Sequence, residues 1–593
     1  MLMKDRIKRY MRAVFFNDIM AFPYVDVDVS VQKERDYIDW IYSDIVGLVE
    51  ELVKENAILD SAFIKGMNVT FKTNRFDALL RKFIGDYLVK LFRVIDYYSR
   101  HEEGAKKLLV LEDDPVNRFA VKKYSERFKA APRVRWVKRG HVLYRIFVIF
   151  FQALFILYYS LNTGVIFFRV KKKFKVMREL VLGFHPLGGY YFHDDFLIDE
   201  MSIKKNDLLF FSRKDIKTCE QRNGAYQQAR SMQFNTFYLP SLKIGLGTFF
   251  FRVAPLYMAG GMGALLAEVS SANFSMFSSI SRYFLHYALP YEKVFSNYEI
   301  GAEINHDYYS TRHIVESIIC QNAGTRYYLM HWSDMSLDVS RYGTSFLGCD
   351  KYFVWGHAHI RGSEGPDITM CSGYIFKRFI KKVQANRSSV MSDIGIRQSG
   401  KVVTFFDESF GGGFPMTAEH HVNFWKTALE LATKEPKLTV IMKPKELSRY
   451  RMLPRELRDE FLEIKKRIEE LDNTYIINTR KWSFIEFIGI SDIVVTASMT
   501  SSGTIAIICG IEGLYLDEAG LDHPFSKILK DKGVFKESDK LLKMIREILN
   551  GEVSVLSEIP KDAMRSIDEY PDDRGIDVVR AVLTRNESGV LHN

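Results

Sequence analysis

The amino-acid sequence predicts an α/β protein with two units of alternating strands and helices behind a helical N-terminal region. In residues 401–517, apolar runs of strand length alternate with amphipathic segments of helix length. Residues 293–356 show this order over a shorter stretch, whereas residues 1–103 place apolar side chains at spacings of three and four. Strands that alternate with helices form parallel, doubly wound sheets, because each connection crosses a face of the sheet.

Length and composition fit this class. The chain has 593 residues, 47% hydrophobic and 26% charged, which is enough for several domains of roughly 100 to 200 residues. The formal net charge of +10 favours anionic partners, but the basic residues are dispersed and no nucleic-acid-binding motif occurs. We therefore expect phosphorylated substrates and anionic lipid as partners, and no nucleic acid.

The cysteines and the N-terminus indicate a reducing compartment. The cysteines form no CxxC pair and no nearby CxxH, which argues against a zinc site and a disulfide framework: Cys219, Cys320, Cys349, Cys371 and Cys509. The basic N-terminus lacks the apolar run and the cleavage site of a signal peptide. We expect a cytoplasmic protein.

The elements of the first unit follow from short patterns. KKLLVLEDDP, VNRFAVKKYSERFKA and PRVRWV predict a strand, a helix and a strand from residue 106 to 137. ELVLGFHP and NDLLFFSR predict further strands, and residues 246–290 predict helix. From residue 293 the expected order is strand KVFSNYE, helix STRHIVESIICQNAG ended by Gly324, strand TRYYLMHW and strand CDKYFVWG.

An uncharged segment interrupts this unit. Residues 146–168 contain no charge over 23 positions, close to the roughly 20 residues that cross a bilayer as a helix. Basic residues flank both ends, so the segment has no preferred orientation and can span the membrane or dip into one leaflet. The alternative is a buried helix, in which Gln152, Ser160, Asn162 and Thr163 find partners inside the protein.

The second unit has the clearest pattern. A mostly polar connector, residues 373–400, precedes strand KVVTFFDE, and helices then alternate with strands KLTVIMKP, TYIINT, DIVVTAS and GLYLD. We expect three regions: helices in residues 1–103, an acceptor-side domain in residues 104–380 that includes residues 146–168, and a nucleotide-donor domain in residues 381–593.

The loops after the strands are the expected ligand sites, because helix N-termini there expose N–H groups. Glycines after the first strand permit close approach of a phosphate, and hydroxyls after the fourth surround the start of an apolar helix. Lysines after the second strand can neutralise phosphate, and acidic residues after the last can accept bonds from ribose. The candidate donor-binding residues are Gly411, Gly412, Gly413, Lys443, Lys445, Ser498, Thr500, Ser501, Ser502, Thr504 and Asp517, with Glu518, Asp522 and His523 beside them.

Candidate catalytic groups follow strands of the first unit. His331, with Ser333, ends one strand, and a histidine at a strand end has a tunable pKa suited to a general base. His306, Asp307 and Glu303 lie at the end of another strand. His193 and Asp194 form a further pair beside glycines, and a structural role remains the alternative for each of these residues.

Three segments resemble known enzymes: YYSTRHIVESIICQNAGTRYYLMHW, KPKE and KWSFIEFIGISDIVVTASMTSSGTIAIICGIEGLYLD, about a ninth of the chain. They are similar to bacterial surface-polysaccharide transferases and the CDP-glycerol glycerophosphotransferase group, which belong to the GT-B glycosyltransferases. The resemblance implies two Rossmann-like domains across a cleft, donor phosphates on Ser501, Ser502 and Thr504, and no catalytic metal. The chain departs from the pattern at Met330 and Trp332, where many relatives have Gln and Gly, and at Ile507 and Ile508, where they have Glu and Ala.

The expected function is transfer of a sugar or sugar-like group from a nucleotide-activated donor to a surface polysaccharide or lipid-linked acceptor, at the inner face of the cell membrane. A base near His331 or Asp307 would deprotonate the acceptor hydroxyl, while the serine loop and Lys443 stabilise the departing phosphate. We expect no cofactor. The alternatives are a non-catalytic polysaccharide-assembly protein of the same fold and a sugar-nucleotide epimerase.

Overall fold

The computed structural model describes most of the two α/β units. The described ranges are residues 44–100, 108–137, parts of 145–156, 171–179, 203–212, 235–239, 242, 253–306, 310–331, 345–360, 368–397, 400–410, 416–445, 447–478, 482–520, 524–529, 532–572 and 574–585. Structural statements below refer to these residues.

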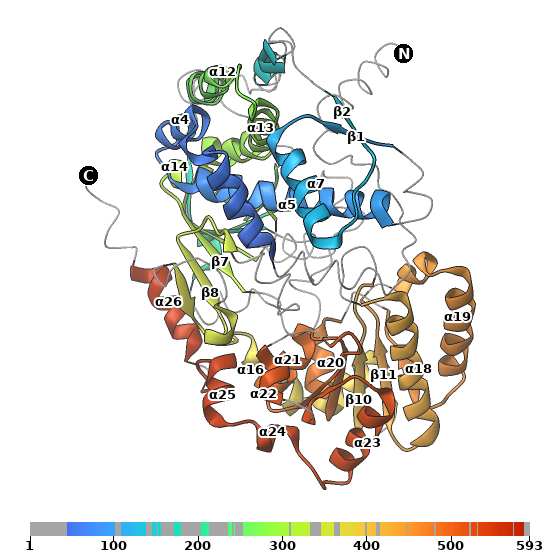
Figure 1. Ribbon diagram of the computed structural model, residues 1–593. Helices are drawn as coiled ribbons and strands as arrows, with labels where there is room; N and C mark the ends of the chain where they lie inside the picture. The colour runs from blue at the N-terminus through green and yellow to red at the C-terminus, as the bar shows by residue number, and fades with distance from the viewer. Residues whose placement is uncertain are drawn as a thin grey trace, which may run out of the picture.

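The C-terminal domain is built on a six-stranded parallel sheet (Figure 1). Its strands are β10(Val402–Phe406), β11(Thr439–Lys443), β12(Thr474–Ile476), β13(Ile493–Ala497), β14(Glu512–Leu516) and β15(Val534–Phe535). They are ordered β12-β11-β10-β13-β14-β15, so the chain winds outward from β10 in one direction and then from β13 in the other. This is the doubly wound sheet that the alternating pattern predicts.

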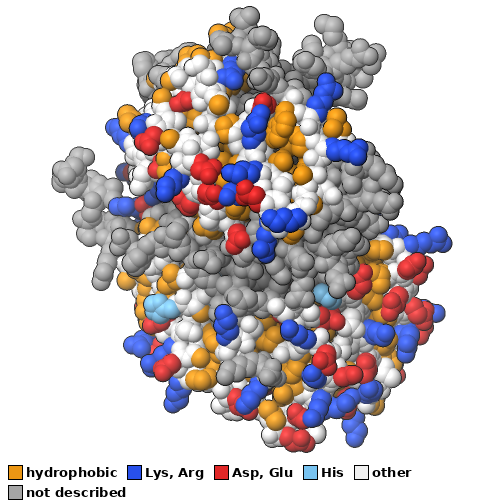
Figure 2. Space-filling view, in the orientation of Figure 1, with side chains coloured by type: hydrophobic (Ala, Val, Ile, Leu, Met, Phe, Trp, Pro, Cys, Tyr) orange, Lys and Arg blue, Asp and Glu red, His pale blue; other side chains and the backbone are white. Residues whose placement is uncertain are grey.

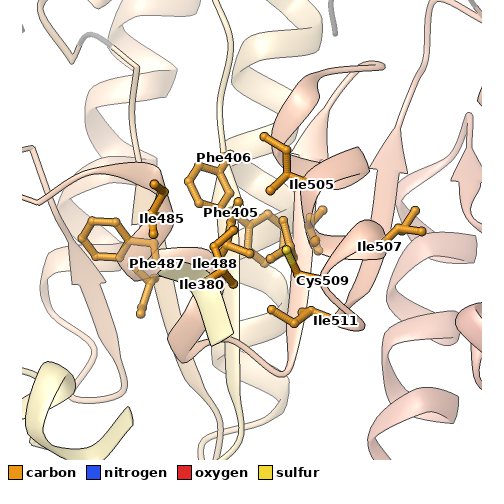
Figure 3. Packing of buried hydrophobic residues seen from close by; sticks show 14 of the residues in the cluster. Ile380, Phe405, Phe406, Ile485, Phe487, Ile488, Ile505, Ile507, Cys509 and Ile511 are labelled. Atoms are coloured by element: carbon orange, nitrogen blue, oxygen red, sulfur yellow. The ribbon is translucent and has the colours of Figure 1, made fainter. Parts of the chain in front are cut away.

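Two groups of helices pack around this sheet. The first group is α18(Ala418–Lys434), α19(Arg455–Glu469) and α23(Ser538–Leu549), and the second is α20(Phe484–Ile490) and α21(Ser501–Ile508). Thr417 caps α18, and α20 begins with a capping box between Ser483 and Glu486. Figure 3 shows the buried side chains around β10: Phe406 lies on the face covered by the isoleucines of α20 and α21, whereas Phe405 points to the other face, where its ring lies 5.5 Å from Phe424 of α18.

The N-terminal domain contains a seven-stranded parallel sheet with the same winding. Its strands are β3(Lys172–Glu179), β4(Leu208–Ser212), β5(Asn235–Tyr238), β6(Tyr298–Asn305), β7(Arg326–Met330), β8(Lys351–Val354) and β9(Thr369–Cys371). The order β5-β4-β3-β6-β7-β8-β9 again runs outward from the first strand on both sides. The expectation of two Rossmann-like sheets is therefore confirmed.

Helices cover one face of this sheet. They are α4(Ala62–Thr70), α5(Arg75–Arg100), α7(Pro115–Phe128), α12(Gly263–Ala267), α13(Phe274–Asn297) and α14(Arg312–Asn322), with the π-helix η7(Leu256–Met262). Gly324 has φ of 77° and ends α14 as predicted. The predicted strand–helix–strand unit also forms, because β1(Leu109–Glu112) and β2(Val134–Val137) flank α7, but it is a separate two-stranded sheet.

One predicted strand is wrong at its start. Residues 293–297 of KVFSNYE belong to α13, and β6 begins only at Tyr298. The apolar spacing of α13 continues through this run, since Tyr291, Val294 and Phe295 are all buried in the helical core.

The described part of the apolar segment lies against α13. Gln152 is buried, its Nε2 donates to Ser278 Oγ at 3.3 Å, and its Oε1 accepts from Ser281 Oγ at 2.9 Å. These bonds satisfy the amide inside the protein, as the buried-helix alternative requires. None of the helices in the described ranges is long and apolar enough to cross a membrane.

The connector and the C-terminal segment join the two domains. The connector forms α16(Lys377–Ala385) and α17(Arg387–Ile394), and α16 packs on α20 so closely that a Cβ on Gly489 would lie 2.5 Å from Val383. After α24(Val555–Glu558), the chain returns to the N-terminal sheet, where α25(Lys561–Ile567) and α26(Gly575–Arg585) lie near β8 (Figure 1). Glu569 N donates to Trp355 O at 3.1 Å, and this bond holds the C-terminal segment against the N-terminal domain.

Candidate functional site

The strand order reverses between β10 and β13, and we call this switch point, beyond the carboxyl ends of the two strands, the crevice. These strands are neighbours, with Phe406 beside Thr496, and Phe406 also pairs with Lys443 of β11. The connection after β10 leads to one side of the sheet and the connection after β13 to the other. Ligands of doubly wound sheets bind where such loops separate, beyond the carboxyl ends of the strands.

The loop after β10 contains buried polar groups. The Asp407 carboxylate accepts hydrogen bonds from Lys445 N and, at 3.3 Å, from Trp425 Nε1. Burial raises the pKa of Asp407 to about 7 despite these bonds. Ser409 is fully buried, and its hydroxyl has no hydrogen-bond partner among the residues that the structure describes. Gly411, Gly412 and Gly413, predicted to face a phosphate, lie outside the described residues.

The loop after β13 divides the predicted hydroxyls into two kinds. Ser498 Oγ donates to Asp517 Oδ1 at 3.3 Å, and Thr504 Oγ1 lies 3.0 Å from Tyr515 Oη, so both are committed to buried partners. Thr500 is the N-cap of α21, but its side chain makes no capping hydrogen bond. Thr500, Ser501 and Ser502 are half-buried at the first turn of α21, where a helix N-terminus favours an anion.

The two predicted lysines have different surroundings. Lys443 ends β11 and is half-buried, and burial lowers its pKa. Its Nζ lies 5.6 Å from the Phe487 ring centroid. Glu486, whose pKa is raised by burial, lies in the same environment. Lys445 is exposed and forms an ion pair with Glu408. Lys443 is therefore the lysine that the strand end presents at the crevice.

A small pocket lies at the ends of β13 and β14. It is lined by Met416, His420, Phe424, Ala497, Ser498, Leu516, Asp517, Glu518 and Ala519. Asn423 Nδ2 donates to Glu518 Oε1 at 2.7 Å, and burial raises the pKa of Glu518. Carboxylates beside an apolar wall suit a ribose and its base. Asp522 and His523 fall outside the described residues.

On the N-terminal sheet, His331 follows β7 inside an aromatic cluster. It is buried, its Nδ1 lies 2.6 Å from Tyr352 Oη, and its ring packs against Trp355 at 5.0 Å and His359 at 4.7 Å between centroids. Trp355 Nε1 donates to His331 O at 3.0 Å. These contacts fix the orientation of the imidazole.

The remaining predicted catalytic residues do not gather around His331 in the described structure. Glu303 of β6 is fully buried, where its carboxylate accepts from Tyr291 Oη and, at 3.3 Å, from Cys320 Sγ. His306 is half-buried just after β6. Asp307, Ser333, His193 and Asp194 lie outside the described residues.

The site also contains residues outside the candidates that the sequence patterns indicate. Asp407 directly follows an apolar strand, the position where a doubly wound sheet places a ligand-facing group. Trp425, which holds Asp407, and Glu486, which lies near Lys443, sit in amphipathic helices and looked like ordinary surface or core residues. Figure 2 shows acidic and basic side chains mixed over the visible face of the C-terminal domain, so charge alone did not mark the crevice.

Two doubly wound parallel sheets, linked by a helical connector and a returning C-terminal segment, define a two-domain Rossmann-like protein of GT-B-like architecture. No protein-family model matches the chain, and no curated protein matches it in sequence. Among solved structures, the wall teichoic acid polymerase TagF is similar with a TM-score of 0.41 and 8% identity, over 76% of this chain and 99% of that one.

Two further structures are similar at the same level. The UDP-GlcNAc 2-epimerase from Neisseria meningitidis bound to UDP-GlcNAc has a TM-score of 0.43 and 10% identity, over 70% of this chain and 100% of its own. The alpha,alpha-trehalose-phosphate synthase (UDP-forming) from Burkholderia vietnamiensis has a TM-score of 0.38 and 10% identity, over 72% and 99%.

Proposed function

We propose that the protein is a transferase that moves a sugar or sugar-like group from a nucleotide-activated donor to a glycan or lipid-linked acceptor. The observation that carries the proposal is the crevice between β10 and β13, where the half-buried residues Thr500, Ser501 and Ser502 lie at the start of α21 and the Thr500 side chain makes no capping bond. Lys443 ends the strand on the other side of β10. This combination suits the phosphates of a nucleotide.

The reaction is a displacement. The acceptor hydroxyl oxygen bonds to the transferred group, the bond between that group and the donor phosphate breaks, and the hydroxyl proton passes to a base. His331 is the proposed base, because Tyr352 holds its Nδ1 and fixes the ring. The start of α21 and Lys443 stabilise the phosphate that leaves, and Asp517 with Glu518 binds the ribose.

The first test of this proposal is nucleotide binding. We expect CMP, CDP, UDP or GDP to raise the unfolding temperature, since a ligand at 100 times its dissociation constant stabilises a protein by about 2.7 kcal/mol. The double variant Ser501→Ala/Ser502→Ala should lose at least about tenfold in affinity and keep its stability without ligand, because neither hydroxyl is in the core. Thr433→Ala, which removes a hydroxyl at the far end of α18, is the matched control.

Three outcomes separate the alternatives. Turnover that requires an acceptor supports the transferase. Conversion of a free nucleotide sugar without an acceptor identifies an epimerase. A protein that binds none of the nucleotides, with unfolding temperatures unchanged, is the non-catalytic assembly protein, and the transferase proposal is then wrong.

We also propose that the enzyme works at an anionic membrane surface. Six of the ten exposed large hydrophobic side chains in the described structure lie on adjoining elements, which we call the apolar end: Val69, Ile146, Phe150, Leu154, Met258 and Leu266. Arg145 Nη1 ties two of these elements together by donating to Val269 O and Ser271 O at 2.8 Å. Residues 253–267 contain no charged side chain, so this end suits the lipid interface.

Vesicle sedimentation tests this surface. Phe150→Glu combined with Met258→Glu should reduce binding to phosphatidylcholine vesicles containing phosphatidylglycerol by at least about tenfold, since each buried side chain of this size contributes about 1.5–3 kcal/mol. The controls are Met452→Glu and Leu462→Glu, two exposed apolar residues of the C-terminal domain. Equal binding by both sets of variants contradicts membrane contact through the apolar end.

A further inference from the structure

Three chain segments meet beyond the ends of β8 and β9. Trp355 O accepts hydrogen bonds from both Gly373 N at 3.0 Å and Glu569 N at 3.1 Å. The packing at this junction is tight, because a Cβ on Gly356 would lie 2.4 Å from Ser566 O. Backbone bonds therefore hold the loop after β8, the loop after β9 and the returning C-terminal segment in fixed positions.

Each of these segments contributes one side chain with a metal-ligating atom. His357 comes from η8(His357–His359) after β8, Cys371 ends β9, and Glu569 lies between α25 and α26. One ligand atom from each residue lies within 4.8 Å of the other two, and His357 Nε2 is 3.5 Å from Glu569 Oε2. The His–Glu ion pair explains two of these residues and Cys371 also packs against the N-terminal core, but neither contact accounts for the convergence of all three ligand atoms.

We propose that His357, Cys371 and Glu569 form a binding site for Zn²⁺ or a similar borderline-soft divalent ion. Imidazole, thiolate and carboxylate are the ligands of Zn²⁺, which takes four of them in a tetrahedron. Metal–ligand bonds of roughly 2.0–2.3 Å place tetrahedral ligand atoms about 3.3–3.8 Å apart, so the side chains must close by about 1 Å. His357 and Glu569 have 68% and 33% exposed side chains and can turn to do so.

Binding of the metal ion releases one proton. The Cys371 thiol releases its proton to solvent as sulfur bonds to the metal, and His357 and Glu569 bind in their unprotonated forms. Water from the exposed side supplies the fourth ligand. The bound ion cross-links the last segment of the chain to the N-terminal sheet, so it stabilises the two-domain arrangement independently of the proposed transferase activity.

Cobalt titration of the metal-free full-length protein tests the proposal. We expect one Co²⁺ per chain to produce a near-ultraviolet thiolate-to-metal charge-transfer band that Zn²⁺ displaces. Cys371→Ser should abolish the band, and His357→Ala or Glu569→Gln should weaken affinity by at least about 100-fold, beyond the 10–100-fold typical of outer-shell partners. Cys349→Ser, which replaces a buried thiol just before β8, is the control and should keep the band.

A stability measurement makes the test independent of the spectrum. Zn²⁺ should raise the unfolding temperature of the unaltered protein and of Cys349→Ser, but not of Cys371→Ser. A band that persists in Cys371→Ser overturns the proposal. So does an equal Zn²⁺ effect in His357→Ala, or the absence of both band and stabilisation in a folded protein.

Discussion

At the residue scale, the buried carboxyl group of Asp407 carries an electrostatic cost to folding. Its carboxyl group is buried beside Trp425, and its pKa is raised from 3.8 to about 7. Between these two pH values the carboxyl group is protonated in the folded protein and ionised in the unfolded chain. A folded-state pKa above the unfolded value destabilises the fold as pH rises. The contribution of Asp407 to the free energy of unfolding should therefore fall between about pH 4 and pH 7, by at most about 1.4 kcal/mol per pH unit.

Asp407→Asn tests this cost, because asparagine has nearly the same shape and cannot ionise. The variant should gain stability relative to the unaltered protein as pH rises through this window, and the difference should level off above about pH 7. Urea unfolding at several pH values measures it. A difference that does not change with pH would show that Asp407 ionises in the folded protein as it does in the unfolded chain.

At the scale of elements, α21 and β14 approach so closely that no side chain fits between them at two glycines. A Cβ on Gly503 would lie 2.7 Å from the Tyr515 ring, and a Cβ on Gly513 would lie 2.6 Å from Gly503 O. Two facing glycines thus bring the start of α21 close to the end of the sheet. The position of the proposed phosphate site depends on this contact.

Gly503→Ala should therefore destabilise the protein by about 1–3 kcal/mol, despite the better helix propensity of alanine. The matched control is Gly47→Ala in an N-terminal helix, where a Cβ meets nothing within 4 Å and stability should stay equal or rise. Thermal unfolding of both variants measures the difference. A neutral Gly503→Ala would mean that Tyr515 moves aside without cost.

Some strands of the two sheets can be predicted from the sequence and others cannot. Strands β10, β11, β13 and β14 were predicted because buried parallel strands are continuous apolar runs. The central strand β3 was not predicted, because its sequence KKFKVMRE is rich in lysine. Its first lysines reach polar partners at the end of the sheet, with Lys172 Nζ 2.7 Å from Asn235 Oδ1 and Lys173 Nζ 3.1 Å from Glu299 Oε1.

The candidate site was predictable to the level of its loops but not of its side chains. Strand ends located Lys443 and the hydroxyls after β13. Ser498 is buried and bonds to Asp517, whereas Ser501 is half-buried in the first turn of α21, and this difference depends on contacts with a strand that follows later in the chain. Residues 357, 371 and 569 are too widely spaced for any local motif to reveal their convergence.

At the scale of the whole molecule, a buried ion pair holds the returning C-terminal segment. Lys377 of α16 pairs with Asp568, with side chains only 3% and 2% exposed, and Lys377 Nζ also donates to Tyr570 O at 3.0 Å. Asp568 Oδ1 accepts from Tyr374 N at 2.9 Å. The connector and the C-terminal segment therefore share one polar junction that is closed to water.

Lys377→Met should destabilise the protein by about 3–5 kcal/mol, because it leaves the Asp568 carboxylate buried without its cation. The double variant Lys377→Met/Asp568→Asn should recover part of the loss, and Lys381→Met on the exposed side of α16 should have little effect. Thermal unfolding and limited proteolysis of residues 555–585 measure these outcomes. Full stability of Lys377→Met would show that the pair does not hold the segment.

The returning segment also sets the order in which the chain can finish folding during synthesis. β9 is an edge strand of the N-terminal sheet, and the loops after β8 and β9 are completed by residues 566–576, about 200 positions later. At about 5–20 residues per second, the ribosome needs roughly 10 to 40 s to make that stretch. The first sheet to emerge is thus the last to be completed, and a nascent chain stalled before residue 566 leaves the loops after β8 and β9 without their packing partners and open to chaperones.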